Sequence, residues 1–220
     1  MLKGTKSFQI VTFNLDFYYN TNKLPEFKKI CTQSDLIIPD GFGIIFLLKR
    51  KYQINVNRIT GNQILLLLLE LATELELKTA FIGSSEKVQA KLKEKVGKLF
   101  SSIKIVSSIS PNHYFEMDET TNQLVIDKLK ESKPDIVFVA LGSPRQEIWI
   151  NQIKNFLDAR IYIGVGAAFD YFTGTKKRAP QFLQTIGLEW FWRVINEPSR
   201  LFKRYFINDI PFFLKKLFRL

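Results

Sequence analysis

Short apolar runs alternate with longer stretches of helical periodicity along most of the chain. The apolar runs predict six β-strands, at Phe8–Phe13, Leu36–Ile38, Lys78–Ile82, Ile103–Val106, Asp135–Leu141 and Arg160–Val165. We expect helices after most of these strands. The alternation therefore predicts an α/β fold, with a Rossmann-like, largely parallel sheet flanked by helices.

Two connecting segments show the helical pattern most clearly. Glu86–Phe100 carries an apolar stripe and is preceded by Ser84-Ser85, whose hydroxyls suit a helix cap. Asn62–Leu75 contains an almost continuous run of leucines, which predicts a helix buried on most sides.

The pattern changes after about Arg178, where strands give way to short aromatic and basic helical segments. We expect these segments to be broken at Pro198 and Pro211, because proline interrupts a helix. On a helical wheel, Phe212–Leu220 separates a mostly apolar side from a basic side. This pattern predicts an amphipathic tail that seeks an interface.

Composition and charge add a preference for anionic partners. At 220 residues, 46% hydrophobic and 24% charged, the chain resembles an ordinary globular protein, and its net charge of +11 favours nucleic acid, anionic lipid or phosphorylated small molecules. From Lys176 onward, ten Lys and Arg residues accompany three acidic ones, and nine aromatic residues lie between Trp190 and Phe218. We therefore expect an α/β domain, residues 1–178, and a helical membrane-associating appendage, residues 179–220.

Several classes of protein are disfavoured. The single cysteine, Cys31, excludes an internal disulfide and is compatible with the cytoplasm. The N-terminal residues lack the apolar stretch of a signal peptide. The longest purely apolar run, Ile64–Leu69, is far below the roughly 20 residues of a spanning helix, so we expect a soluble or peripheral protein.

Three short polar segments could carry chemistry: Thr12-Phe13-Asn14, Pro39-Asp40-Gly41 and Arg58-Ile59-Thr60-Gly61. Taken alone, Thr12 and Asn14 are better explained as a strand end followed by a turn. Asp40 is equally compatible with a general base at the carboxyl end of a strand and with a common Pro-Asp-Gly turn. Arg58 is equally compatible with a phosphate clamp and with a surface arginine beside a helix cap.

Two glycine turns follow later strands. In the more specific one, Gly142 allows close backbone approach, and an exposed pair formed by Gln146 and Glu147 could hydrogen-bond a base or sugar. Gly164 and Gly166 form a second turn that could contact a nucleotide, although this turn is weak as a dinucleotide signature.

Some residue patterns are missing. The sequence has no Asp-x-Asp, one histidine (His113) and no P-loop. These observations predict a site with no metal and no cofactor, and they disfavour hydrolysis of nucleoside triphosphates.

Taken in order, these segments resemble the WecG/TagA/CpsF family of bacterial glycosyltransferases, from Thr12 to about Tyr205. The matching segments are Thr12-x-Asn14, Pro39-Asp40-Gly41-x-Gly43, Arg58-x-Thr60-Gly61, Gly142-x-Pro144-Arg145-Gln146-Glu147-x-Trp149, Gly164-Val165-Gly166-x-x-Phe169-Asp170, Gly174-x-x-x-Arg178-Ala179-Pro180, Gly187-Leu188-Glu189-Trp190 and Glu197-Pro198-x-Arg200-Leu201. Departures from the family pattern occur at Gly83-Ser84-Ser85, at His113 and at Gln63, and they bear on the identity of the donor sugar.

The resemblance implies a catalytic α/β domain that performs an inverting, metal-independent transfer. The donor would be a UDP-linked N-acetylmannosamine-type sugar, its uronic acid or another hexosamine, and the acceptor N-acetylglucosamine on undecaprenyl diphosphate, in teichoic acid, common antigen or capsule pathways. It also implies a cytoplasmic protein that is peripheral on the inner face of the plasma membrane, binds an anionic membrane surface and self-associates.

The resemblance also implies roles for individual residues. Asp40 would be the general base, supported by Thr12. Donor-binding roles would fall to Asn14, Arg58, Tyr114, Gly142, Gln146, Glu147, Gly164, Gly166 and Asp170. The acceptor diphosphate would be neutralised by Arg193, Arg200 and Arg204.

Three alternatives remain at this point. The charge and the interleaved aromatic residues are compatible with a nucleic-acid-binding module, although no recognised nucleic-acid motif is present. A non-catalytic scaffold of polysaccharide assembly would require a degraded site, yet Thr12, Asp40, Arg58 and Gln146 are all present. An NAD-dependent enzyme is disfavoured because no early glycine-rich turn is found.

Overall fold

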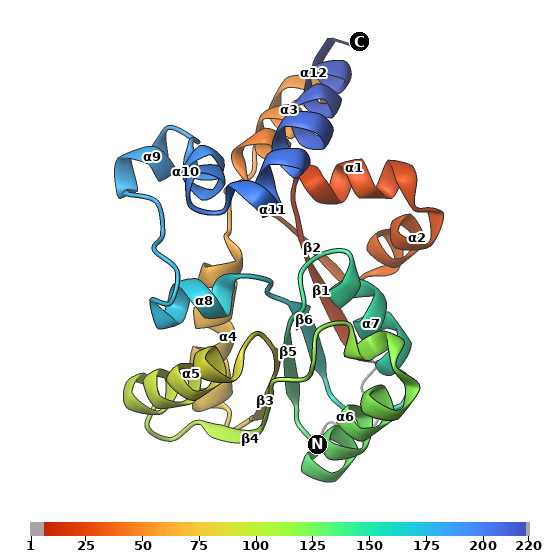
Figure 1. Cartoon of the computed structure of the whole chain (residues 1–220), viewed down its shortest axis with the longest axis vertical. Helices are drawn as coiled ribbons and strands as arrows, with labels where there is room; N and C mark the ends of the chain where they lie inside the picture. The colour runs from red at the N-terminus through yellow and green to blue at the C-terminus, as the bar shows by residue number, and fades with distance from the viewer. Residues whose placement is uncertain (1–6, 219–220) are drawn as a thin grey trace.

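The computed structural model describes residues 7–218, in which six strands form one entirely parallel sheet (Figure 1). The strands are β1 (Phe8–Phe13), β2 (Leu36–Pro39), β3 (Lys78–Gly83), β4 (Lys104–Ile109), β5 (Ile136–Ala140) and β6 (Ile161–Gly164). Their order across the sheet is β2-β1-β6-β5-β3-β4. The predicted α/β fold is therefore confirmed, and only β4 extends well beyond its predicted end.

Helices cover both faces of the sheet. They form most of the crossover connections that parallel strands need. They are α1 (Leu15–Lys23), α2 (Pro25–Gln33), α3 (Phe42–Tyr52), α4 (Gly61–Glu74), α5 (Glu86–Leu99), α6 (Glu119–Ser132), α7 (Arg145–Ile153) and α8 (Ala168–Thr173), with a short 3₁₀ turn, η1 (Phe115–Met117). One core cluster packs α4, α5 and α8 on one face, and a second packs α6 and α7 on the other.

The two clearest helix predictions are confirmed at their caps. The Ser85 hydroxyl accepts a hydrogen bond from the Val88 amide at the start of α5. Thr60 and Gln63 form a capping box at the start of α4. Burial of α4 is less complete than its leucines predict, because Leu67 is exposed on its outer side.

From residue 181 onward every described element is helical. These elements are α9 (Gln181–Thr185), α10 (Glu189–Asn196), α11 (Pro198–Phe202), the π-helical segment η2 (Lys203–Asp209) and α12 (Ile210–Phe218). They lie beyond the end of the sheet, where η2 packs against α1 and α12 packs against α3 (Figure 1). The predicted basic, aromatic-rich helical appendage is present.

The predicted break at Pro211 is wrong. Pro198 does begin a helix, but the backbone runs without interruption from α11 through η2 into α12. Pro211 is the second residue of α12 and lies directly after η2, so the helical backbone passes through this proline where π-helical bonding gives way to α-helical bonding. Between residues 7 and 218, no helix is both long enough and apolar enough to span a bilayer.

Candidate active site

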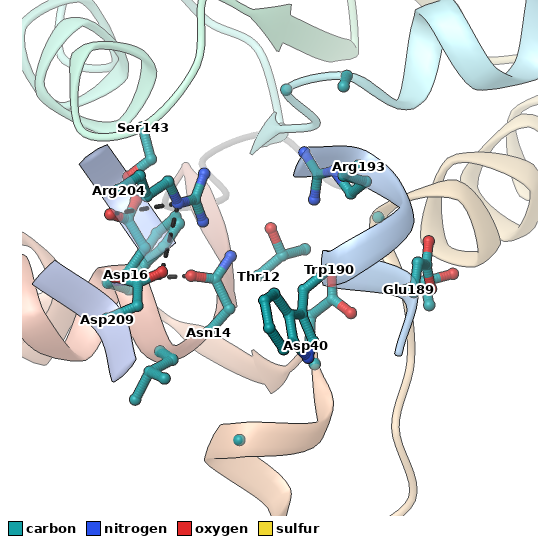
Figure 2. Close-up of a pocket in the computed structure, with 18 of the residues that line it drawn as sticks. Thr12, Asn14, Asp16, Asp40, Ser143, Glu189, Trp190, Arg193, Arg204 and Asp209 are labelled. Atoms are coloured by element: carbon teal, nitrogen blue, oxygen red, sulfur yellow. Dashed lines mark hydrogen bonds and ion pairs between the residues drawn. The ribbon is translucent and has the colours of Figure 1, made fainter. Parts of the chain in front are cut away.

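A cavity of about 500 Å³ lies at the carboxyl ends of the strands, where open α/β sheets bind ligands. Its walls come from the turns after β1, β2, β5 and β6, from the start of α4 and from the C-terminal helices. Figure 2 shows Thr12, Asp40 and Arg193 around this cavity, with Ser143, Asp16, Arg204 and Asp209 grouped on another side. Of the predicted site residues, the lining includes Thr12, Asn14, Asp40, Arg58, Gly142, Gln146, Gly166, Arg193, Arg200 and Arg204.

Asp40 is held between β2 and α3. Its backbone amide donates to the carbonyl of Phe13 at 2.8 Å, which ties the turn after β2 to the end of β1. Burial raises the pKa of the Asp40 carboxyl, while Arg58, a hydrogen bond from the backbone of Gly61, and Arg193 lower it in part. A carboxylate with a raised pKa is a stronger proton acceptor than an ordinary aspartate.

The side chains of Thr12 and Asn14 also serve the backbone around them. The buried Thr12 hydroxyl donates to the carbonyl of Gly164 at 3.4 Å and so links β1 to the end of β6. Asn14 caps α1, because its side-chain oxygen accepts from the Phe17 amide at 3.2 Å. The strand-end explanation therefore holds for both residues, although both line the cavity.

Gln146 connects the two glycine turns. Its Oε1 accepts from the amides of Gly142 and Gly166, both at 3.1 Å, and its Nε2 donates to Glu147 Oε1 at 2.6 Å. The expectation that Gln146 and Glu147 are exposed is wrong, since they are only 3% and 1% exposed. The pair fixes the shape of both turns, and Gln146 reaches the cavity edge.

Gly164 is required by this pair. A Cβ atom at Gly164 would lie 2.4 Å from Gln146 Nε2 and 2.6 Å from Glu147 Oε1, so a larger residue would displace this hydrogen-bonded pair. Burial raises the pKa of Glu147 to about 7, while the hydrogen bond from Gln146 and the nearby Ser143 hydroxyl oppose this shift. Neither Gly164 nor Glu147 lines the cavity.

Tyr114 and Asp170 also lie outside the cavity lining. Tyr114 is half exposed on the loop before η1, where the Arg145 guanidinium stacks 4.1 Å from its ring centroid. Asp170 lies on α8, and its pKa is raised by burial and lowered by Lys176.

The arginines of the cavity differ in how far they are already paired. Arg193 lines the cavity, and its Nε is buried with no hydrogen-bond partner among residues 7–218. Arg58 contacts Glu189 at 3.3 Å, and Arg178 contacts the same carboxylate at 3.5 Å. Arg200 is 52% exposed and pairs with Glu197. Arg193 therefore has the guanidinium most available to a new anion.

Arg204 is enclosed by two carboxylates. Its Nε lies 3.4 Å from Asp16 Oδ1 and 3.5 Å from Asp209 Oδ2 (Figure 2). Asp209 is 1% exposed, and burial raises its pKa to about 7, although Arg204 opposes the shift. Arg204 thus joins η2 to α1, and the predicted diphosphate contact would have to compete with these two acids.

Several cavity residues carried no predicted role. These are Asp16, Asn62, Ser143, Tyr171, Arg178, Glu189, Trp190, Tyr205 and Asp209. Arg178, Glu189 and Trp190 lie within matched segments of the sequence, which is the signal that could have identified them. Asp16 and Asp209 are 193 positions apart, and their sequence surroundings give no sign that they share Arg204.

Metal ligands are sparse in the part of the chain that the structure describes. Residues 7–218 contain no group of three His, Cys, Asp or Glu side chains that could hold a metal ion. The polar residues that line the cavity include arginines, carboxylates, threonines and asparagines.

Comparison with known proteins agrees with this arrangement. A protein from Bacillus spizizenii (strain ATCC 23059 / NRRL B-14472 / W23), named N-acetylglucosaminyldiphosphoundecaprenol N-acetyl-beta-D-mannosaminyltransferase, is 32% identical over 199 residues, covering 90% of this chain and 75% of that protein. A protein of the same name from Bacillus subtilis (strain 168) is 30% identical over 191 residues, covering 87% of this chain and 72% of the relative. The model of the glycosyl transferase WecG/TagA/CpsF family matches residues 1–220. The chain therefore belongs to the WecG/TagA/CpsF family of glycosyltransferases.

Proposed function

We propose that this chain transfers an N-acetylmannosamine-type sugar from a UDP donor to N-acetylglucosamine on undecaprenyl diphosphate. The names of the two Bacillus relatives support this sugar and this acceptor. The observation that carries the proposal is the cavity that holds Asp40 together with Arg58 and Arg193. A proton acceptor and an available cation are the two groups that a sugar transfer from a diphosphate needs most.

The transfer is a single displacement with inversion. Asp40 accepts the proton of the acceptor hydroxyl, whose oxygen attacks the anomeric carbon of the donor sugar. The bond from that carbon to the phosphate oxygen breaks, and UDP departs with the electron pair. One displacement reverses the anomeric configuration, and one carboxylate is enough to perform it.

The leaving diphosphate is stabilised by the protein. We propose that the donor lies along the Gly142 and Gly166 turns, where two strands end at the cavity. Arg58, beside Asp40, faces the leaving diphosphate of the donor, and Arg193 and Arg200 face the diphosphate of the acceptor. Fixed cations in a cavity can stabilise growing negative charge without a divalent ion, which supports metal-independent transfer.

The lipid acceptor places the reaction at a bilayer. We propose that the protein works on the cytoplasmic side as a peripheral protein bound to anionic lipid. Support comes from exposed apolar side chains on the C-terminal helices, among them Phe202, Ile207 and Phe218, next to Lys203 and Lys215. Basic residues near apolar ones favour an anionic membrane surface.

The reaction is tested by incubating purified protein with a short-chain lipid-diphosphate N-acetylglucosamine and a panel of UDP-N-acetylhexosamines. We expect product from one donor, with the same yield when EDTA is present. Product that disappears with EDTA would contradict metal independence. No product from any donor would contradict the proposed reaction.

A further inference from the structure

One surface outside the cavity has no role in the proposed transfer. It is formed by α3, by residues 53–57 that follow it, and by α12, which we call together the α3–α12 tip. Figure 1 shows α3 and α12 side by side at the top of the molecule, and contacts between the two helices agree. The rings of Phe46 and Phe213 join them, with centroids 5.9 Å apart.

Both helices start at the cavity and run away from it. The first turns of α3 and α12 supply apolar lining to the cavity, through Phe42, Phe213 and Leu214. Phe42 is fixed there by the loop before α10, because a Cβ atom at Gly187 would lie 2.7 Å from its ring and Gly187 has a φ of +79°. An apolar wall therefore leads from the cavity toward the far ends of both helices.

The far ends of the two helices are basic. The last turn of α3 carries Lys49, Arg50 and Lys51, and the last turn of α12 carries Lys215 and Lys216. Neither helix contains an acidic residue, and residues 53–57 contain none either. The amino group of Lys216 is directed toward α1, where it donates to Asn22 Oδ1 at 3.4 Å, so the tip combines the other four cations with no negative charge.

Apolar side chains stand among these cations. Every residue from 49 to 57 is exposed. Tyr52 is 56% exposed and Phe218 is 78% exposed. Ile54 and Val56, in the segment that follows α3, are exposed as well. Basic and apolar side chains on one surface match the boundary between lipid headgroups and acyl chains.

We propose that the α3–α12 tip docks on an anionic lipid bilayer, with α3 providing half of the contact from within the α/β domain. The proposal rests on the proposed function, because a lipid-linked acceptor gives the protein a reason to reach a bilayer. Its evidence is the α3–α12 tip. With the tip on the bilayer, the apolar wall would guide the isoprenoid part of the acceptor from the lipid toward Asp40.

A second copy of the chain is a poorer occupant of this surface. In a two-fold symmetric dimer the same surface meets itself, so four cations would face four cations. Like charges held together in this way oppose association. An anionic bilayer offers the complementary charge along the whole tip.

The test removes the charge of α3 alone. The variant Lys49→Gln/Arg50→Gln/Lys51→Gln leaves the apolar side chains, α12 and all cavity residues in place. The control, Lys87→Gln/Lys91→Gln/Lys93→Gln, removes the same charge from exposed positions of α5, near the β4 edge of the sheet. A second variant, Lys49→Arg/Lys51→Arg, keeps the charge and should bind as the unmodified chain does.

Binding is measured by cosedimentation with vesicles of phosphatidylcholine and phosphatidylglycerol, without donor or acceptor. Each basic residue near an anionic surface contributes about fivefold to partitioning, so the α3 variant should bind about a hundredfold more weakly. The α5 control should change little, because α5 lies at the opposite end of the molecule from the tip (Figure 1) and salt screens the field of the bilayer over about 10 Å. Vesicles of phosphatidylcholine alone should bind all variants weakly.

Equal binding by the α3 variant and the α5 control would overturn the proposal. So would a shift from dimer to monomer caused by the α3 variant, or loss of oligonucleotide binding with vesicle binding unchanged. Transfer to a water-soluble short-chain acceptor should be unaffected in the α3 variant. Vesicle binding needs no chemistry, so failure of the docking surface and failure of the proposed transfer are distinguishable.

Discussion

At the scale of single residues, Asp40 shows how one position can serve a turn and a site together. Its Pro-Asp-Gly setting is equally compatible with a simple turn, and the backbone bond to Phe13 holds Asp40 at the end of β1. Asp40 is nevertheless half-buried, beside Arg58 and Arg193. Sequence spacing gives no access to that burial, because it depends on helices that enter from residues 181–218.

Replacing Asp40 by Asn should abolish most transfer. The amide keeps the shape of the side chain and cannot accept the proton, so kcat should fall by about 10²- to 10⁴-fold. Donor binding, measured by calorimetry, should stay within about tenfold, because a general base adds little to ground-state affinity. Asp158→Asn, at an exposed position, is the matched control. Near-normal turnover of Asp40→Asn would remove Asp40 from the role of base.

The pH dependence of transfer should report the same carboxyl. A base works only when deprotonated, so kcat/KM should fall as the pH is lowered through the pKa of Asp40. Because burial raises this pKa, the loss should begin at a higher pH than an ordinary aspartate, near 3.9, would give. A profile that stays flat down to about pH 4 would contradict the raised pKa.

Arg193 and Arg200 should differ in their effect on the acceptor. Arg193 has a buried Nε without a partner among the described residues, whereas Arg200 is half exposed and paired with Glu197. Arg193→Ala should raise the KM for the lipid-diphosphate acceptor by about 10- to 100-fold, the range of a charged hydrogen bond. Arg200→Ala should raise it by less than about fivefold. Equal effects would contradict the assignment of Arg193 as the more available cation.

At the scale of elements, the C-terminal helices depend on the contact between η2 and α1. Asp16, Arg204 and Asp209 form this contact, and all three line the cavity. The sequence correctly predicts that this region is helical, and it shows that the region is basic and rich in aromatic residues. It does not predict the continuity of the helices through Pro211, because a π-helical segment that runs directly into the first turn of α12 leaves no signature in residue periodicity.

Replacing Asp209 by Asn should change how stability depends on pH. The pKa of Asp209 is raised to about 7, so the folded chain holds this proton more tightly than the unfolded chain, whose aspartates titrate near 3.9. The resulting stability is complete below about pH 4 and is lost as the pH rises through about 7. Asp209→Asn should therefore raise Tm more at pH 8 than at pH 5, by about 2–4 °C for each kcal/mol gained.

The control for this prediction is Asp127→Asn, on the exposed side of α6. It should leave the pH dependence of Tm unchanged. If Asp209→Asn lowered Tm at pH 8, the ionised carboxylate would be the stabilising form, and the direction of the shift would be wrong.

At the scale of the whole molecule, the sequence predicts the fold well. Buried parallel strands appear in it as short apolar runs, and the helices that connect them appear as stretches of helical periodicity. Thr12, Asp40, Arg58 and Gly142 all line the cavity at one edge of the sheet. Their positions near strand ends or before a helix, which the sequence predicts, account for this. The sequence does not predict which way a side chain points at the start of a helix. Gln146 and Glu147, in the first turn of α7, are therefore buried where exposure is expected. The UDP donor, inversion, metal independence and self-association stay predictions.

The anomeric configuration of the product tests the central claim most directly. Product formed from a UDP-N-acetylhexosamine in the presence of EDTA would be analysed by nuclear magnetic resonance, through the one-bond carbon–hydrogen coupling at the transferred anomeric carbon. A single displacement assisted by Asp40 predicts a configuration opposite to that of the donor. Retained configuration would require two displacements through a covalent intermediate, or attack on the face from which UDP departs. Either would contradict the proposed mechanism and the role of Asp40.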